Sequence, residues 1–383
     1  MKFSYILTPL LVVTLLASCT KKEEETQPAI SVPSAYNATN YTTNAADEIA
    51  LGERFEALAD EMDLGASTAN TLSATTLKTL FDAGTPSLSD VTPANLKTAM
   101  TTTGGWFDLM ATASGNTWTP AIPNGSSTGG VFAGATKAYL YDPNGVQYNE
   151  VIEKVLNNAS FYNHVIELTS SSYDAKTADK ILAIYGAQHT FANSNNAVLH
   201  PNDYDRFTAN YVARRDKNDG KGFYTKIKNN LIIFQASLQG GSAYNTSRNE
   251  ALKNIKKNWE RAMLASAINY SNDALSTLSK TTLTDNDKTA ALHSISEAIG
   301  FIVAWYGVPQ EHRTITDAQV ATCLTYLEFS LTSVPTTYEF ITNNSPTQLA
   351  QLTALNETIK GIYGFTNAEM IDFKTNWVSQ QGR

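Results

Sequence analysis

The chain has 383 residues, of which 42% are hydrophobic and 17% are charged, and its formal net charge is −8. A chain of this length can bury a substantial core and can form one large or two modest domains. Its lysines and arginines form no concentrated basic face of the kind that phosphate contacts require, so we expect no nucleic-acid partner.

The first residues, 1–18, have the features of a bacterial lipoprotein signal peptide. Lys2 supplies the positive start, and residues 6–16 form an apolar stretch that is too short to span a bilayer comfortably. The run Leu16-Ala17-Ser18-Cys19 then matches a lipobox, so we expect cleavage before Cys19 and acylation of its side chain. An ordinary cleaved signal with an incidental cysteine is the alternative. Each buried methylene of an acyl chain contributes about 0.8 kcal/mol, so several chains on Cys19 would attach the protein to a membrane.

Residues 19–35 are expected to form the lipidated cysteine and a flexible tether. Thr20 stands where an aspartate would favour retention in the inner membrane, so the outer membrane is favoured. The run Lys21-Lys22-Glu23-Glu24-Glu25 resembles the charged, acidic signal that sends some lipoproteins to the cell surface. A solvated tether is the alternative interpretation of this run, and residues 27–34, with two prolines, fit a tether in either case.

Helical periodicity dominates from residue 36 onward, whereas strand-type alternation is scarce. We therefore expect an all-α fold, with one domain over residues 36–383. The predicted parts of this domain are N-terminal helices over 45–112, the third of them over 93–111, a first hairpin unit over 135–200, a second hairpin unit over 246–308, and C-terminal helices over 316–380.

The clearest helical pattern is the pair of segments within residues 254–306. In its second segment, Leu292, Ile295 and Ile299 lie on one face, and a narrow face with His293, Glu297 and the small residue Gly300 lies roughly opposite. Small residues at such spacing let another helix approach closely. A weaker copy of the pattern appears over residues 146–195, which suggests a duplicated helical hairpin, although chance similarity between amphipathic helices is the alternative.

Four residues of the two hairpins are candidate metal ligands: Glu153, Glu260, His293 and Glu297. Carboxylate and imidazole groups that converge between helices form the metal sites of helical bundles. The alternative is structural, with Glu260 paired to Lys256 or Lys257, Glu153 paired to Lys154 or to a neighbouring helix, and His293 paired to Glu297, four residues on. The bound cofactor, if there is one, is therefore expected to be a metal ion.

Two tryptophans, Trp106 and Trp118, lie beside the longest irregular stretch, residues 116–134. They could stack on a sugar ring or a partner, or they could pack this stretch onto the core. Cys323 is the only cysteine besides Cys19, which excludes an internal disulfide and a thiolate metal cluster once Cys19 is lipidated, and we expect Cys323 to be a buried core thiol. We expect His164, in a polar setting, to be solvated.

Several short blocks, in the same order, resemble an uncharacterised family of bacterial lipoproteins, the domain of unknown function 4856. The blocks are Tyr36, Leu51-Gly52-Glu53-Arg54-Phe55, Tyr148-Asn149-Glu150-Val151-Ile152-Glu153-Lys154, Tyr185-Gly186 and Ser296-Glu297-Ala298-Ile299-Gly300-Phe301. They span nearly the whole mature chain. The chain has Leu182-Ala183 where the family has an acidic pair and Val155 where it has a glycine, so the resemblance implies a diverged member.

A more distant similarity is to the imelysin-like proteins, which are helical envelope proteins with two related bundles and links to iron uptake. Their signature is Gly-x-His-x-x-Glu. In this chain His189 comes one position late after Gly186, and Ala192 stands where the glutamate should follow. The resemblance implies an imelysin-like arrangement of helices and makes His189 a candidate ligand residue, but the signature itself is not met.

We therefore expect an outer-membrane lipoprotein, attached through lipid on Cys19, that faces the periplasm or, more in keeping with the acidic run, the cell surface. Its expected role is to bind a ligand, whether a metal ion or haem, a glycan or an envelope protein. One alternative is an imelysin-like metal-dependent peptidase, which turnover of peptides would reveal. The other is a purely structural or adhesive envelope protein, which self-association would favour.

Overall fold

The computed structural model describes residues 30–121, 127–134, 137–171, 173–342 and 346–383. The predicted signal peptide, the lipidation site Cys19 and most of the tether lie outside these residues. The described chain is helical apart from one two-stranded sheet, so the predicted all-α class is confirmed. None of its helices combines the length and the apolar character that crossing a membrane requires.

The helices and strands divide into an N-terminal and a C-terminal half of the chain. The N-terminal half comprises α1 (Tyr41–Asn44), α2 (Ala46–Asp63), the 3₁₀ turn η1 (Leu64–Ala66), α3 (Ala74–Phe81), α4 (Leu88–Val91), α5 (Ala94–Thr101), α6 (Trp106–Ala113), β1 (Gly130–Ala133), β2 (Ala138–Tyr141), α7 (Tyr148–Val155), the π-helix η2 (Leu156–Ser160), α8 (Phe161–Leu168) and α9 (Thr177–Tyr185). The C-terminal half comprises α10 (Phe207–Arg215), α11 (Phe223–Gln239), η3 (Ser242–Tyr244), α12 (Asn245–Leu278), α13 (Asp285–Val303), η4 (Ala304–Gly307), η5 (Gln310–His312), α14 (Asp317–Thr325), α15 (Glu339–Thr342), α16 (Pro346–Tyr363), α17 (Asn367–Asp372) and α18 (Trp377–Gln381).

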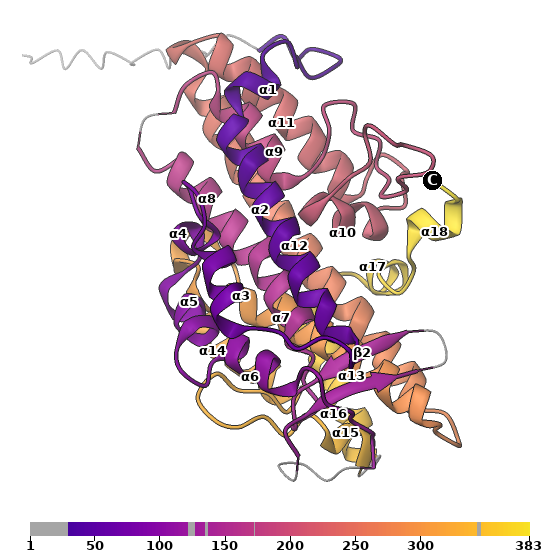
Figure 1. Ribbon diagram of the computed structural model, residues 1–383. Coiled ribbons are helices and arrows are strands. Elements are labelled where there is room, and N and C mark those ends of the chain that lie inside the picture. The colour runs from indigo at the N-terminus through magenta and orange to yellow at the C-terminus, as the bar shows by residue number, and fades with distance from the viewer. Residues whose placement is uncertain (1–29, 122–126, 135–136, 172, 343–345) are drawn as a thin grey trace, which may run out of the picture.

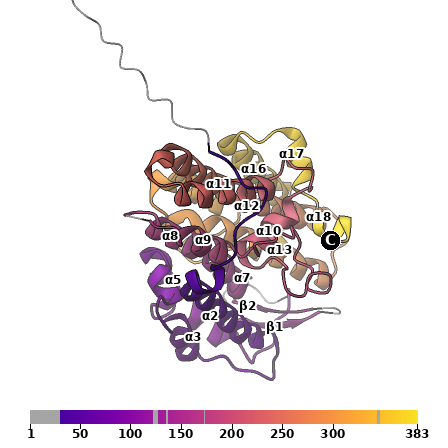
Figure 2. The same cartoon turned by 90° about the horizontal axis from the view of Figure 1, so that it is seen from above.

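The long helix α12 runs through the molecule, and α10, α11, α13 and α16 pack against it (Figure 1). On the other side of α13 lies α7, and α2 covers α7 and α9. Seen from above, the N-terminal helices α2, α3 and α5 form one side of the molecule, and α11, α16 and α17 form the opposite side (Figure 2). The contact between α7 and α13 therefore joins the N-terminal half of the chain to the C-terminal half.

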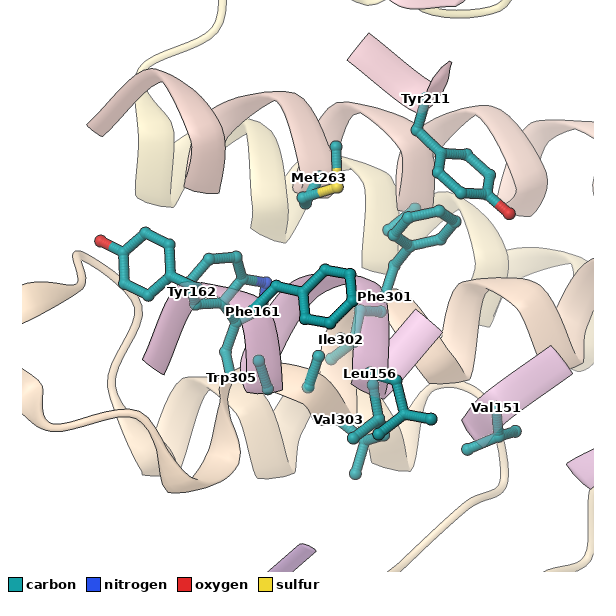
Figure 3. Packing of buried hydrophobic residues seen from close by; sticks show 14 of the residues in the cluster. Val151, Leu156, Phe161, Tyr162, Tyr211, Met263, Phe301, Ile302, Val303 and Trp305 are labelled. Carbon is teal, nitrogen blue, oxygen red and sulfur yellow. The ribbon is translucent and has the colours of Figure 1, made fainter. Parts of the chain in front are cut away.

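Aromatic side chains fill the space between these helices (Figure 3). Tyr162 makes edge contacts with Trp259 and Trp305, at ring-centre distances of 5.9 and 5.1 Å. Tyr211 of α10 meets Phe301 of α13 edge-on at 4.9 Å. Complete burial of one such side chain contributes about 1.5–3 kcal/mol, so this core holds the walls of any neighbouring cavity in place.

Gly300 lets α7 and α13 approach closely, as the small residues of the narrow face predict. A Cβ atom at Gly300 would lie 2.8 Å from Cβ of Lys154 and 3.1 Å from Cα of Val151, closer than side chains tolerate. Helix α13 starts at a capping box, in which the Thr284 hydroxyl accepts from the Asp287 N–H and the Asp287 carboxylate accepts from the Thr284 N–H. The cap fixes the start of the helix, and the glycine fixes its distance from α7.

Three predicted segments differ in detail from the structure. The helix expected over residues 93–111 is two helices, α5 and α6, which meet at Gly104-Gly105, where Gly104 has a φ of +77°. Part of the stretch predicted to be irregular, residues 116–134, forms β1, whose Val131 pairs with Leu140 of β2. The first hairpin unit contains the π-helix η2, and its C-terminal helix α9 follows α8 as a separate element. The duplication of the hairpins stays a prediction.

Candidate functional site

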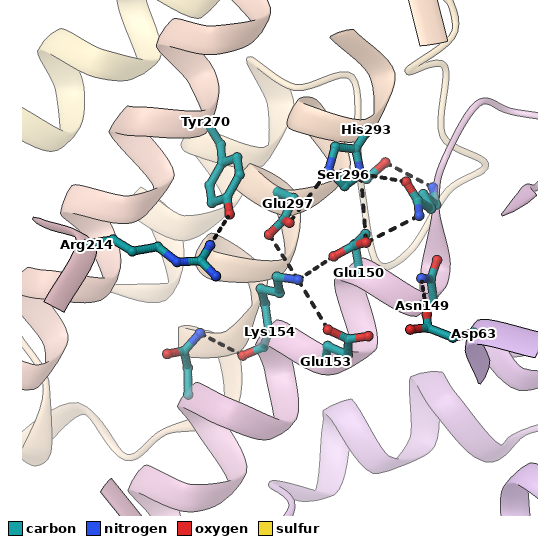
Figure 4. A network of polar contacts seen from close by, with 12 residues as sticks. Asp63, Asn149, Glu150, Glu153, Lys154, Arg214, Tyr270, His293, Ser296 and Glu297 are labelled. Atoms are coloured by element: carbon teal, nitrogen blue, oxygen red, sulfur yellow. Dashed lines mark hydrogen bonds and ion pairs between the residues drawn. The ribbon is translucent and has the colours of Figure 1, made fainter. Parts of the chain in front are cut away.

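The contact between α7 and α13 brings together a cluster of buried and partly buried ionisable side chains (Figure 4). Glu150, Glu153 and Lys154 come from α7, and His293 and Glu297 come from α13. The spacing of four residues within each helix places Glu150 and Lys154 on one face of α7 and the other pair on one face of α13. The two faces meet because Gly300, one turn beyond Glu297, admits the backbone of α7.

Lys154 is the centre of the cluster. Its ammonium group pairs with Glu150, lies 3.0 Å from Oε2 of Glu297 and donates to Oε2 of Glu153 at 3.4 Å. Only 2% of the lysine side chain is exposed. The contact with Glu297 is an ion pair without hydrogen-bond geometry, because the buried Oε2 accepts no hydrogen bond from the described residues. One cation therefore serves three carboxylates.

The pKa values of the carboxylates diverge because Lys154 is shared unequally. Burial alone would raise the pKa of Glu150, but the charge of Lys154 holds it well below its ordinary value. Burial raises the pKa of Glu297 and of Glu153, and Lys154 offsets this effect only in part. Burial would lower the pKa of Lys154, yet Glu150 and Glu297 raise it. The cluster thus holds one firmly ionised pair and two carboxyl groups that retain protons more readily.

His293 is held in one orientation. Its Nδ1 lies 2.8 Å from Oε1 of Gln147, and the amide nitrogen of Gln147 donates to Oε1 of Glu150 at 3.3 Å. Because an amide oxygen can only accept, Nδ1 carries the hydrogen, and the lone pair of the neutral ring is on Nε2, 3.8 Å from Oε1 of Glu297. Burial lowers the pKa of His293 to about 4, so the ring is neutral at neutral pH.

These side chains line a cavity of about 580 Å³ that reaches the surface at the exposed residues Asp63 and Lys137. The other lining residues come from η1, β2, α7, α10, α12, α13 and the residue before α7: Ala66, Ala138, Gln147, Asn149, Glu150, Glu153, Lys154, Tyr211, Arg214, Tyr270, His293 and Glu297. A second hollow of about 230 Å³ adjoins the first and shares two of its lining residues, Glu153 and Tyr211. The space is large enough for a small organic molecule.

Three donor groups in the wall could hold a metal ion. One ligand atom each from Glu150, His293 and Glu297 lies within 4.8 Å of the others. Two carboxylate oxygens and an imidazole nitrogen suit a divalent ion such as zinc or iron, and the hydrogen bond from His293 Nδ1 to an amide oxygen is the kind of outer contact that orients metal-binding histidines. The Lys154 ammonium, however, already lies against both carboxylates, so a metal ion has to compete with it.

The structure brings together three of the four predicted metal ligands and separates the fourth. Glu153, His293 and Glu297 line the cavity, whereas Glu260 binds the loop before α14. Its carboxylate accepts hydrogen bonds from the Thr314 and Ile315 N–H groups at 2.8–3.0 Å and from the Tyr363 hydroxyl at 2.6 Å. The expectation that Glu260 joins the cluster is therefore wrong, because these donors hold its oxygens elsewhere.

None of the three predicted ligand-binding residues lies in the cavity wall. Trp106 is buried and stacks on Tyr148 at a ring-centre distance of 5.8 Å, and Trp118 is buried against Tyr141 at 4.9 Å. Both tryptophans therefore belong to the core, the alternative that the sequence left open. His189 is exposed beside Tyr41 and away from the cluster.

The expectation that His164 is solvated is wrong. It is buried, with Nε2 3.4 Å from Oε1 of Glu48 and Nδ1 3.3 Å from Oε2 of Glu167. Lys180 also pairs with Glu48, at 3.1 Å. This group forms a second buried polar network, away from the cavity, that joins α2 to α8 and α9.

Sequence reasoning missed much of the site. Glu150 and Lys154 lie in the block that carries the family resemblance, but nothing in their spacing showed that they face Glu297 across a helix contact. Arg214 and Tyr270 come from helices α10 and α12, far away in the sequence, and only tertiary packing places them at the cavity. The spacing of four between Glu150 and Lys154 is the one signal that could have found part of the cluster.

Comparisons with models of protein families, with curated proteins and with solved structures find no match to this chain. The resemblance to domain of unknown function 4856 and to the imelysin-like proteins stays a prediction, and the site has to be interpreted from its own chemistry.

Proposed function

We propose that this chain is a lipid-anchored protein of the bacterial outer membrane that binds a small polar ligand in the cavity between α7, α10, α12 and α13. The observation that carries the proposal is the convergence of buried ionisable groups on a cavity of about 580 Å³. Buried charges cost free energy unless they are paired, and three carboxylates that share Lys154 are incompletely paired. A polar ligand would supply the partners that these carboxylates lack.

The membrane attachment rests on the sequence before the described residues. The lipobox ending at Cys19, Thr20 after it and the following acidic run support an outer-membrane lipoprotein displayed at the cell surface. A Cys19→Ser substitution should move the protein from the membrane fraction to the soluble fraction and abolish palmitate labelling. Unchanged labelling would contradict the anchor. Digestion of the protein by a protease added to intact cells tests whether it faces outward.

A cavity-blocking substitution tests the binding role. Ala138 lines the cavity from β2, so Ala138→Trp should fill part of the space without removing a charge. Ala197, in an exposed loop, provides a matched control as Ala197→Trp. Thermal unfolding of the full chain, purified in detergent, is then followed against metal salts, monosaccharides and oligosaccharides, and dipeptides. A ligand at a hundred times its Kd stabilises the folded state by about 2.7 kcal/mol.

We expect at least one compound class to raise the Tm of the natural chain and of Ala197→Trp, but not of Ala138→Trp. Stabilisation that survives in Ala138→Trp would place the ligand elsewhere. No stabilisation by any class, together with self-association of the chain, would instead favour a structural or adhesive envelope protein.

A second candidate, a metal ion, is favoured by the donor set of Glu150, His293 and Glu297 and by the fixed lone pair on Nε2 of the histidine. This candidate includes the imelysin-like metal-dependent peptidase. Its test is the metal content of the chain after equilibration with iron, zinc and calcium salts in turn. Near-stoichiometric metal that is lost in Glu297→Ala would support this candidate, and absence of retained metal from every salt would exclude it.

A further inference from the structure

Arg214 is a charged side chain in the cavity wall that lacks a carboxylate partner. In the described part of the chain, no carboxylate oxygen lies within 4.0 Å of its guanidinium group. Neutral groups surround it instead: Nη1 lies 3.5 Å from the Tyr270 hydroxyl, the guanidinium lies over the Tyr211 ring at 5.1 Å, and the side-chain amide of Asn195 lies 3.1 and 3.2 Å from Nε and Nη2. The group is positioned, but its charge is not neutralised.

Glu153 is an acidic side chain in the cavity wall whose pairing with a cation is incomplete. Its carboxylate lines both the main cavity and the adjoining hollow. Among the described residues its one ion-pair partner is Lys154, at 3.4 Å, and that ammonium lies closer to Glu150 and to Glu297. Only 18% of the Glu153 side chain is exposed, so water compensates the charge poorly.

The two groups face one space. Arg214 comes from α10 and Glu153 from α7, and both line the cavity (Figure 4). Tyr211 lines it as well. The Tyr211 ring lies 5.1 Å from the Arg214 guanidinium and 5.6 Å from the Lys154 ammonium, so one aromatic ring contacts both cations. A guanidinium binds carboxylates through paired N–H donors, and a buried carboxylate binds an ammonium group through charge-assisted hydrogen bonds.

We propose that the ligand of this cavity is a small zwitterion, a dipeptide with free termini, whose carboxylate pairs with Arg214 and whose ammonium pairs with Glu153. The proposal rests on the proposed function and names its ligand class. Other classes leave a charge without a partner: a metal ion leaves Arg214 unpaired, an inorganic anion supplies no cation for Glu153, and a neutral sugar compensates neither charge.

The test uses the full chain in detergent and a library of dipeptides in three forms: free, N-acetylated and C-amidated. Isothermal titration calorimetry measures each form of any dipeptide that raises the Tm. A charge-assisted hydrogen bond contributes about 1.5–3 kcal/mol, which corresponds to roughly a 10- to 100-fold change in Kd. We expect acetylation and amidation each to weaken binding by about this factor.

Substitutions assign each terminus to its side chain. Arg214→Gln should weaken binding of the free dipeptide about as much as amidation does, and amidation should then have little further effect. Glu153→Gln should behave in the same way toward acetylation. Glu357→Gln, on the exposed face of α16, is the control and should bind like the natural chain. The blocked peptides test the proposal on the natural chain even if a variant fails to fold.

Two results would overturn the proposal. Blocked dipeptides that bind as tightly as free ones would show that the termini are not recognised. A sugar or metal ion that binds in the natural chain and not in Ala138→Trp, while every dipeptide fails, would refute the zwitterion and leave the cavity as a binding site. If no compound of any class binds, the zwitterion and the proposed function both fail.

Discussion

The ammonium group of Lys154 lies 3.0 Å from Oε2 of Glu297, and this contact joins α7 to α13 in the wall of the cavity. The two residues are far apart in the sequence, and Gly300 permits their approach. The same pair joins two helices and lies in the wall of the cavity, so substitutions that separate its effects on stability and on binding are informative.

Removing the shared cation should destabilise the protein. In Lys154→Met, Glu150 and Glu297 lose their buried partner, and breaking a buried pair from one side costs about 3–5 kcal/mol. Urea unfolding of the natural and variant chains measures the difference. Lys360→Met, which breaks a pair with the exposed Glu357, is the control and should change stability by about 0.5 kcal/mol or less.

The same variant tests whether the Lys154 ammonium competes with a metal ion. Without the competing ammonium, Glu150, His293 and Glu297 should bind zinc more tightly, so added zinc should recover part of the lost stability. Zinc that stabilises the natural chain and Lys154→Met equally would contradict competition between the ammonium and the metal.

His293 should make the stability depend on pH on the acid side of neutrality. Burial lowers its folded-state pKa to about 4, whereas an unfolded histidine has a pKa of about 6.5. Between these values the unfolded chain binds more protons, so the contribution is fully present above about pH 6.5 and is lost as the pH falls toward about 4. The loss should be on the order of 3 kcal/mol.

Urea unfolding across this pH range measures the effect, and His293→Gln should lose less stability than the natural chain as the pH falls. His200→Gln, which alters a half-exposed histidine, serves as the control and should keep the natural slope. Equal slopes in all three chains would show that His293 is protonated as readily in the folded state as in the unfolded state.

Gly300→Ala should push α7 away from α13. The added methyl group would overlap Cβ of Lys154, and overpacking of this kind costs about 1–3 kcal/mol. Gly361→Ala in α16 is the matched control, because among the described residues no atom outside its own helix backbone and chain neighbours lies within 4 Å of its Cβ position. There the gain in helix propensity should stabilise the chain by about 0.5–1 kcal/mol. The Tm should therefore fall in Gly300→Ala and rise in Gly361→Ala. A shift of both variants in the same direction would refute the close contact at Gly300.

We expect Glu260 to stabilise the fold and not to bind a metal ion. In Glu260→Ala, the N–H groups of Thr314 and Ile315 and the Tyr363 hydroxyl lose their acceptor, and each buried donor left unsatisfied costs about 1–3 kcal/mol. Chemical denaturation should show this loss, whereas the metal content of the chain should not change. Loss of bound metal in Glu260→Ala without loss of stability would instead show that Glu260 is a metal ligand.

The sequence by itself determined the helical class and the close packing at Gly300. Both follow from local chemistry, since the 3.6-residue period and the small residues are properties of one segment. It also pointed to His293 and Glu297, because residues four apart on one helix must be neighbours. Lipid attachment at Cys19 rests on the sequence alone, since that residue lies outside the described part of the chain.

Tertiary structure decided the rest of the site. Lys154 and Arg214 line the cavity only because α7 and α10 pack beside α13. The sequence does not show which faces of separate helices meet. Glu260 shows the converse, since it has the right residue type on a neighbouring helix but is bound by the loop before α14. Helical periodicity fixes the face on which a side chain lies, whereas the partner that this face meets depends on packing between distant segments.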